Sequence, residues 1–178
     1  MKNRKTIIVA FMLIACMLIG VGYAALNDSL NITANIGATT EVSGGEFDGN
    51  IKFTDKSITK DDTNKASCVI DSAGDHATIT ADGFTVANQS VVVLLTITNS
   101  STEFDANVTP SVNLDTQHTG VFSATAVWAG ADNLNAKTIA GTGGTAQVEV
   151  TITLLTTPDE AHTATFTVDF AVESVAIA

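Results

Sequence analysis

The chain has 178 residues, with 8 basic residues against 19 acidic ones and a formal net charge of −11 at pH 7. This length suits a single domain with one sizeable core. A surface this acidic repels phosphate backbones and anionic lipid, which argues against nucleic acid and against an anionic membrane surface as partners.

The first 24 residues have the composition of a secretory signal peptide. Lys2, Arg4 and Lys5 precede an unbroken apolar run from Ile7 to Ile19. Small residues follow, and Ala24 precedes Ala25, so we expect a signal helix over residues 1–24 that is cleaved between these two alanines. Five positive charges against 19 negative ones then give the mature chain a formal charge of −14. Its one cysteine, Cys68, has no partner for an internal disulfide, and we expect it to be a small buried apolar residue.

Two alternatives to cleavage remain open for this leader. The apolar character extends to Leu26, and about 20 such residues can cross a bilayer as a helix, so the segment could stay as an anchor. The run Leu13-Ile-Ala-Cys16 resembles a lipoprotein processing box. Apolar residues continue after Cys16 where polar ones are usual, so we interpret Cys16 as part of the signal helix.

The mature chain begins with an alternating segment. Its apolar positions, which are separated by Asn or Thr, are Leu30, Ile32, Ala34 and Ile36. This pattern predicts a half-buried strand within an arm of residues 25–38, ahead of a main domain of residues 39–178. The strand either closes its own sheet or inserts into the next copy, where it would add a strand to an incomplete sheet. Insertion joins copies head to tail and can propagate into a filament.

Alternation continues through the rest of the chain and predicts an all-β fold. Expected strands are 51–53, 67–70, 77–81, 91–98, 107–114, 121–128, 148–154 and 165–173. Turns or loops are expected at 43–45, 82–83, 141–144 and 157–159, where Gly, Pro or Asp cluster. Together these signals favour an antiparallel β-sandwich of about seven to nine strands, jelly-roll-like or immunoglobulin-like.

Four segments carry more specific expectations. Val91 to Leu95 is apolar on both faces and should be a central strand, whereas Pro110 should lie at a sheet edge or a bulge. The charged stretch from Lys56 to Lys65 is predicted to be a solvated loop. Asp132 to Ile139 could form a helical turn or two.

Catalytic and metal-binding motifs are not found in the sequence, so we expect no enzyme, no catalytic residues and no cofactor. His76, His118 and His162 are isolated, with no His-Glu-x-x-His pair and no Gly-x-Ser-x-Gly elbow. The acidic loops Asp61–Asn64 and Asp71–Asp75 do not fit the calcium-loop pattern, which leaves only weak, irregular calcium binding open.

The junction Gly22-Tyr-Ala-Ala-Leu-Asn-Asp28, after a short basic apolar leader and before an alternating strand, resembles the start of the TasA and camelysin family of secreted bacterial matrix proteins. Two later stretches, Leu95–Ser101 and Phe166–Glu173, are similar to family strands. The resemblance implies a jelly-roll subunit, processed by a signal peptidase, that assembles by strand donation into extracellular fibres of the biofilm matrix. Asn27 to Ile36 would be the donated strand, with Leu30, Ile32, Ala34 and Ile36 as its buried contacts.

The main alternative from a different functional class is a monomeric surface adhesin or carbohydrate-binding module, because β-sandwiches often carry binding sites on their loops. Aromatic platforms for sugars are scarce. Trp128 is the one tryptophan, and we expect it in the core. In both readings the protein is secreted, and it meets a membrane only through the signal segment before cleavage.

Overall fold

The computed structural model describes residues 28–38, 49–114, 120–131, 133–157 and 163–176, which form ten strands and no helix. In chain order these are β1 (Asp28–Ala38), β2 (Ile51–Asp61), β3 (Ser67–Ile70), β4 (His76–Phe84), β5 (Ser90–Asn99), β6 (Phe104–Leu114), β7 (Phe122–Trp128), β8 (Lys137–Ile139), β9 (Gly144–Leu154) and β10 (Thr163–Ala176). The predicted signal helix lies outside the described residues. Within them, no helix is long and apolar enough to cross a membrane.

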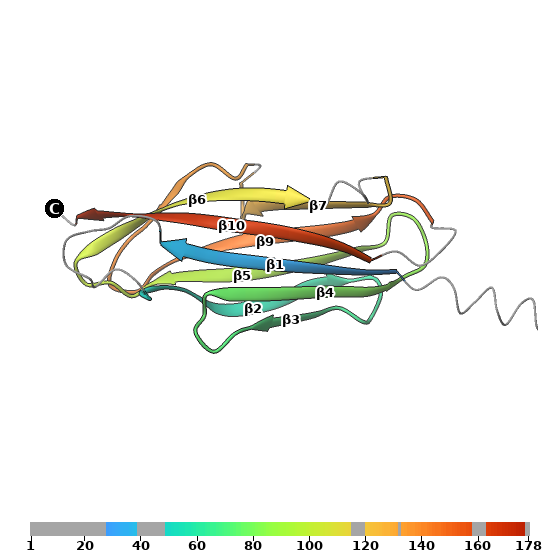
Figure 1. Ribbon diagram of the computed structural model, residues 1–178, viewed down its shortest axis with the longest axis horizontal. Helices are drawn as coiled ribbons and strands as arrows, with labels where there is room; N and C mark the ends of the chain where they lie inside the picture. Colours follow the sequence, from blue (N-terminus) through green and yellow to red (C-terminus); the bar gives the residue numbers. More distant parts are fainter. Residues whose placement is uncertain (1–27, 39–48, 115–119, 132, 158–162, 177–178) are drawn as a thin grey trace, which may run out of the picture.

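The strands form two sheets that lie one over the other (Figure 1). One sheet has six strands in the order β3-β4-β1-β10-β6-β8, and the other has four in the order β2-β5-β9-β7. Every pairing between the described strands is antiparallel except that of β1 with β10, which is parallel. The predicted all-β architecture is therefore confirmed, and its two layers are those of a sandwich.

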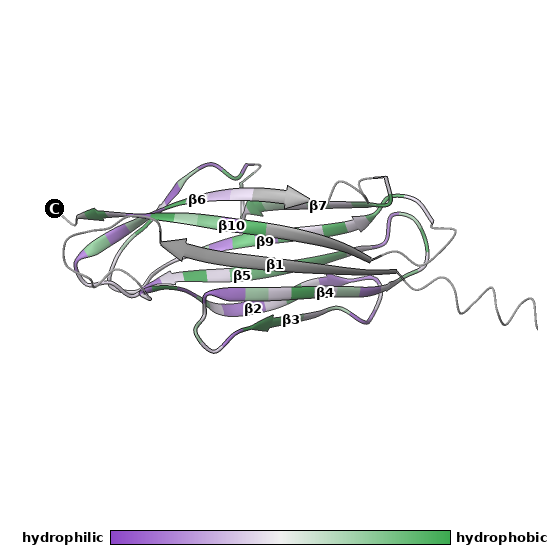
Figure 2. Cartoon of the chain, in the orientation of Figure 1, coloured by the Kyte–Doolittle hydropathy of each residue, from purple (hydrophilic) through white to green (hydrophobic). Residues whose placement is uncertain are grey.

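Alternation along each strand produces these layers, because every second side chain points into the space between the sheets. In β9, Val148, Val150 and Ile152 are fully buried, whereas Glu149 and Thr151 between them are not. β5 lies inside its sheet between β2 and β9, which confirms the central strand predicted from its apolar character. Figure 2 shows the same alternation as bands of colour along the strands.

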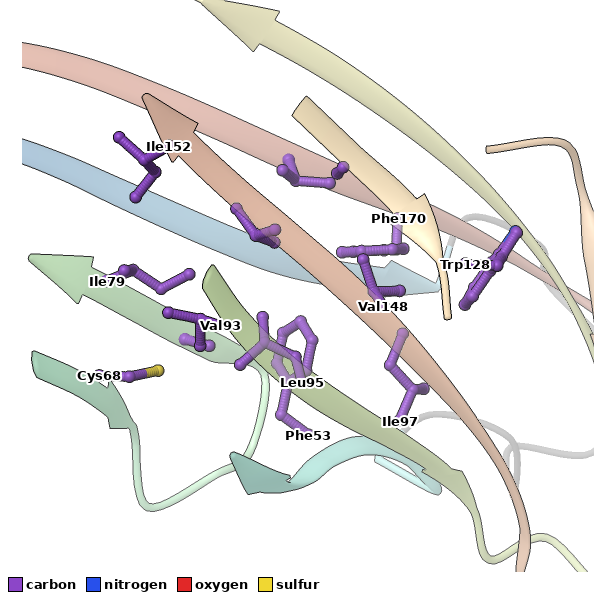
Figure 3. Packing of buried hydrophobic residues seen from close by; sticks show 14 of the residues in the cluster. Phe53, Cys68, Ile79, Val93, Leu95, Ile97, Trp128, Val148, Ile152 and Phe170 are labelled. Atoms are coloured by element: carbon purple, nitrogen blue, oxygen red, sulfur yellow. The ribbon is translucent and has the colours of Figure 1, made fainter. Parts of the chain in front are cut away.

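Buried side chains of both sheets form one core (Figure 3). Phe170 of β10 is in contact with two aromatic rings, Phe53 at 5.8 Å and Trp128 at 6.3 Å between ring centroids. Trp128 is 3% exposed, so its prediction as a core residue is confirmed. Cys68 is also buried, as expected of a small apolar residue.

The edge position predicted for Pro110 is confirmed only locally, because β6 as a whole lies between β10 and β8. Pro110 lies opposite Phe170 on β10, and β8 on the other side of β6 pairs only with Ala106 to Val108. Among the described strands, β6 therefore has a partner on one side only at Pro110, which is the kind of position where proline is tolerated.

Three local predictions are wrong. Lys56 belongs to β2 instead of a loop; the strand continues to Asp61 and pairs with β5 through two irregularities in register. The stretch ending at Ile139 makes the short strand β8, not a helical turn, because Ile139 is buried and pairs with Ala106. Asp82-Gly83 is not a turn but lies within β4, where Gly83 has a φ of +81°.

β2 is one of the two edge strands of the four-stranded sheet, and most of its side chains are exposed. Its side chains are exposed on both faces from Thr54 to Lys60. The register with β5 shifts between Phe53 and Asp55 and again between Ile58 and Lys60. Lysines and bulges of this kind disfavour further pairing at a sheet edge.

Candidate functional site

β1, the first described strand, lies in the middle of the six-stranded sheet between β4 and β10. It pairs antiparallel with β4 from Asp28 to Asn35, and parallel with β10 from Ser29 to Ala38. An N-terminal strand therefore occupies an interior position with partners on both sides. We call the space between β4 and β10 that β1 fills the slot.

The four apolar positions predicted from the sequence fall in register with core positions of both neighbours. The partners are Ala81 and Ala164 for Leu30, Ile79 and Phe166 for Ile32, Ala77 and Val168 for Ala34, and Phe170 for Ile36. Among these partners, Ala77, Ile79, Ala81 and Val168 are 0% exposed and Phe170 is 1% exposed. The sequence thus identified the positions of β1 that match the apolar rows beside it. The predicted cleavage residues Ala24 and Ala25 lie outside the described residues.

In this single chain the strands that hold β1 are its own, which is the simpler of the two arrangements open from the sequence. Whether β1 exchanges between copies stays a prediction. If β1 left the slot, the sheet would separate into β3-β4 on one side and β10-β6-β8 on the other. The core that the two sheets share includes Val93, Leu95 and Val150 of the other sheet, all fully buried in the closed chain. An empty slot would therefore expose apolar surface and two unpaired strand edges, which is a template for another strand.

Hydrogen bonds from the side chain of Asn99 link the two sheets, and the sequence did not predict them. Asn99, at the end of β5, is fully buried, and its Nδ2 donates to the carbonyl oxygens of Phe104 at 2.9 Å and Ile139 at 3.1 Å. Its Oδ1 accepts from the N–H of Ser101 at 3.0 Å. One side chain thus links β5 of the smaller sheet to β6 and β8 of the larger one. A polar residue at a strand end looks like the start of a turn in sequence, and burial is what distinguishes it.

In the two acidic loops considered for weak calcium binding, carboxylate oxygens already accept hydrogen bonds from backbone N–H groups of the same loop. Burial opposes ionisation of Asp61, but hydrogen bonds from Thr63, Ala66 and Asn64 outweigh it and hold its pKa below the usual value. Asp71 behaves in the same way: burial opposes its ionisation, and N–H groups of His76, Gly74 and Asp75 lower its pKa. These carboxylates stabilise turns. In the described part of the chain, no group of three or more His, Cys, Asp or Glu side chains could hold a metal ion.

An open groove of about 430 Å³ lies between the start of β2 and the β3–β4 turn. Lys52, Asp55, Lys56 and Asp71 contribute its charges. Lys56 donates to the carbonyl oxygen of Cys68, Asp55 accepts from the N–H of Lys56, and Asp71 accepts from the N–H of Gly74. Three of its four charged groups are thus engaged with the protein's own backbone, which makes the groove a weak candidate for binding a ligand.

The comparisons with known proteins identify no relative: no family model matches the chain, and no curated protein matches it. The resemblance to the TasA and camelysin family therefore depends on the quoted residues, chiefly those from the leader to the end of β1.

Proposed function

We propose that this chain is a secreted structural subunit whose copies join by exchanging β1 and so build extracellular fibres of a biofilm matrix, on a jelly-roll-like sandwich. The observation that supports the proposal is the position of β1. It is a strand near the N-terminus, joined to the rest of the domain only at its C-terminal end, yet it fills an interior slot. The role requires binding between copies and no catalytic chemistry.

Exchange of β1 is thermodynamically feasible because a donated strand fills the same slot as the chain's own strand. A β1 strand from another copy would lie along the same buried rows of β4 and β10 that the chain's own β1 meets. The balance then depends on concentration, since a short tether gives the chain's own strand an effective concentration on the order of millimolar. Self-closure should dominate in dilute solution, and exchange should require a crowded surface or a step that opens the slot.

Two charge substitutions at neighbouring positions of β1 test the proposal in the mature chain that starts at Ala25. Position 32 is in register with fully buried Ile79, whereas position 31 is in register with Thr80 on the alternate side of the strand. We expect Ile32→Asp to prevent filaments in electron micrographs, because an unpaired carboxylate would have to enter the core. Asn31→Asp adds the same charge next to it and should still allow filaments.

A synthetic peptide with the sequence of residues 27–38 provides a second test on the unmodified chain. We expect it to occupy open slots and to shorten filaments in proportion to its concentration, whereas the same peptide carrying Ile32→Asp should have no effect. If concentrated wild-type chain forms no filaments and remains monomeric, the proposal is wrong, and the monomeric adhesin or carbohydrate-binding module becomes the better reading.

A further inference from the structure

The direction of β1 restricts how copies can be joined. Parallel pairing with β10 puts Ser29 beside Thr163 and Ala38 beside Val172. The end of β1 and the start of β2 lie at the same end of the sandwich, which we call the hinge end (Figure 1). If β1 swings out of its slot, it therefore leaves past the hinge end, with its N-terminus furthest from its own domain.

Exchange that keeps this direction joins two copies only in a closed pair. A strand extending from the hinge end of one copy fits a second slot in the parallel sense when the second copy presents its own hinge end. Both copies then exchange strands about a two-fold axis, and no slot is left for a third. Such a pair cannot grow into a fibre.

A head-to-tail chain with β1 still parallel to β10 is beyond the reach of the connecting segment. The strand has 11 residues, and at about 3.3 Å per residue it covers roughly 33 Å. The connection from Ala38 to Gly49 would have to run past that whole length and also cross to the next molecule, about 10 Å further, or about 43 Å in total. Eleven residue steps reach at most about 40 Å when fully extended.

Reversal of the strand removes this difficulty. A β1 that enters the next slot antiparallel to β10 needs a connection that only crosses the junction between two domains. The alternation of β1 tolerates reversal: with Ser29 opposite Ala171, Leu30 falls opposite Phe170 and Ile32 opposite Val168, so apolar positions still meet buried ones.

We propose that β1 in an assembled fibre lies antiparallel to β10, opposite to its direction within its own chain, and that exchange without reversal stops at a closed dimer. This inference rests on the proposed function and defines the interface that a second copy of the chain makes there. The two directions place Ser29 at opposite ends of β10, about eight residues and roughly 26 Å apart, which a disulfide can distinguish.

Paired cysteines in the mature chain test the direction, in a Cys68→Ala background that leaves no other thiol. Ser29→Cys with Thr163→Cys reports the parallel arrangement, and Ser29→Cys with Ala171→Cys reports the reversed one. Variants with Asp169→Cys or Glu173→Cys in place of Ala171→Cys detect a slip of two residues. After filament assembly and mild oxidation, we expect a ladder of linked chains on a non-reducing gel from one of the reversed pairs, and only linked monomers from the parallel pair.

Each other outcome overturns a defined part of the argument. Filaments whose ladder comes from Ser29→Cys with Thr163→Cys refute the reversal and leave the proposed function intact. Dimers linked only through that parallel pair, without filaments, refute the proposed function as well as the reversal. Monomers alone refute both.

Lengthening the connection tests the geometric cause directly. Insertion of about 12 Gly and Ser residues after Ser43 adds up to about 40 Å of reach. In this variant, parallel insertion becomes possible, and we expect intermolecular links from the parallel pair to appear in filaments. If the added length leaves the pattern of links unchanged, tether length is not what selects the direction.

Discussion

Replacement of Asn99 should destabilise the domain far more than replacement of exposed Ser100 beside it, because one buried amide on the smaller sheet satisfies three backbone groups, two of them in the larger sheet. In Asn99→Leu, the carbonyl oxygens of Phe104 and Ile139 and the N–H of Ser101 lose their partner. A buried polar group left without a partner costs about 1–3 kcal/mol. Two of the three bonds are fully buried, so we expect a loss of roughly 3–5 kcal/mol in the free energy of unfolding.

The nearly isosteric Asn99→Asp separates hydrogen bonding from packing. At pH 7 its carboxylate can still accept from the N–H of Ser101. However, it places a negative charge against the two carbonyl oxygens that accept hydrogen bonds from the Asn99 amide in the wild-type chain. The folded state therefore favours the protonated acid and raises its pKa, so the penalty grows as the pH rises above the unfolded value of about 4. Acidification should recover part of the stability of this variant and none of that lost in Asn99→Leu.

Urea denaturation monitored by tryptophan fluorescence measures these differences, with Ser100→Ala as the control. The hydroxyl of exposed Ser100 bonds Asn50, and its loss should cost under about 1 kcal/mol. If Asn99→Leu unfolds at the same urea concentration and with the same slope as Ser100→Ala, the hydrogen bonds of Asn99 do not contribute to the free energy of unfolding.

Three further predictions concern the charged and reactive groups. The pKa of Asp61 is lowered, so its contribution to stability is present above the unfolded pKa of about 4 and is lost as the pH falls through the lower folded value. Asp61→Asn should therefore flatten the acid side of a profile of thermal-unfolding temperature against pH, measured between pH 6 and 2. An unchanged profile would contradict this. Burial raises the pKa of the Cys68 thiol, and the charge of Lys56 opposes this shift. The native mature chain should therefore react with a thiol reagent only as fast as the fold around Cys68 opens. Immediate reaction in the absence of denaturant would show that the thiol is accessible. Asp82 has a buried Oδ1 without a hydrogen-bond partner. Asp82→Thr should therefore stabilise the domain by about 1 kcal/mol in the urea denaturation assay. Destabilisation would show that the Asp82 carboxylate contributes to folding.

Much of the fold could be predicted because burial on one face leaves a period of two in the sequence. β3 was predicted at its observed bounds, and the core rows of β5, β9 and β10 were all found. Period two reveals which face of a strand is buried, but it does not reveal the neighbouring strand. The parallel pairing of β1 with β10 joins the two ends of the chain and has no local signal.

Each wrong local prediction has its own physical cause. The second half of β2 is exposed on both faces, so no alternation marks it, and only its pairing with β5 makes it a strand. β8 has three residues, which is too short for any period to be recognised. Gly83 suggested a turn because of its permissive backbone, and the same property lets β4 continue at a positive φ.

The unusual edge formed by β2 has a consequence for any material built from this chain. A strand edge that carries lysine ammonium groups and two irregularities in register disfavours edge-to-edge pairing with the sheet of another subunit. Growth by strand insertion would then add subunits along one dimension only, while sideways fusion of neighbouring threads is suppressed. We would expect slender, separable threads that entangle into a gel, in contrast to the stiff laminated plaques formed when bare sheet edges meet.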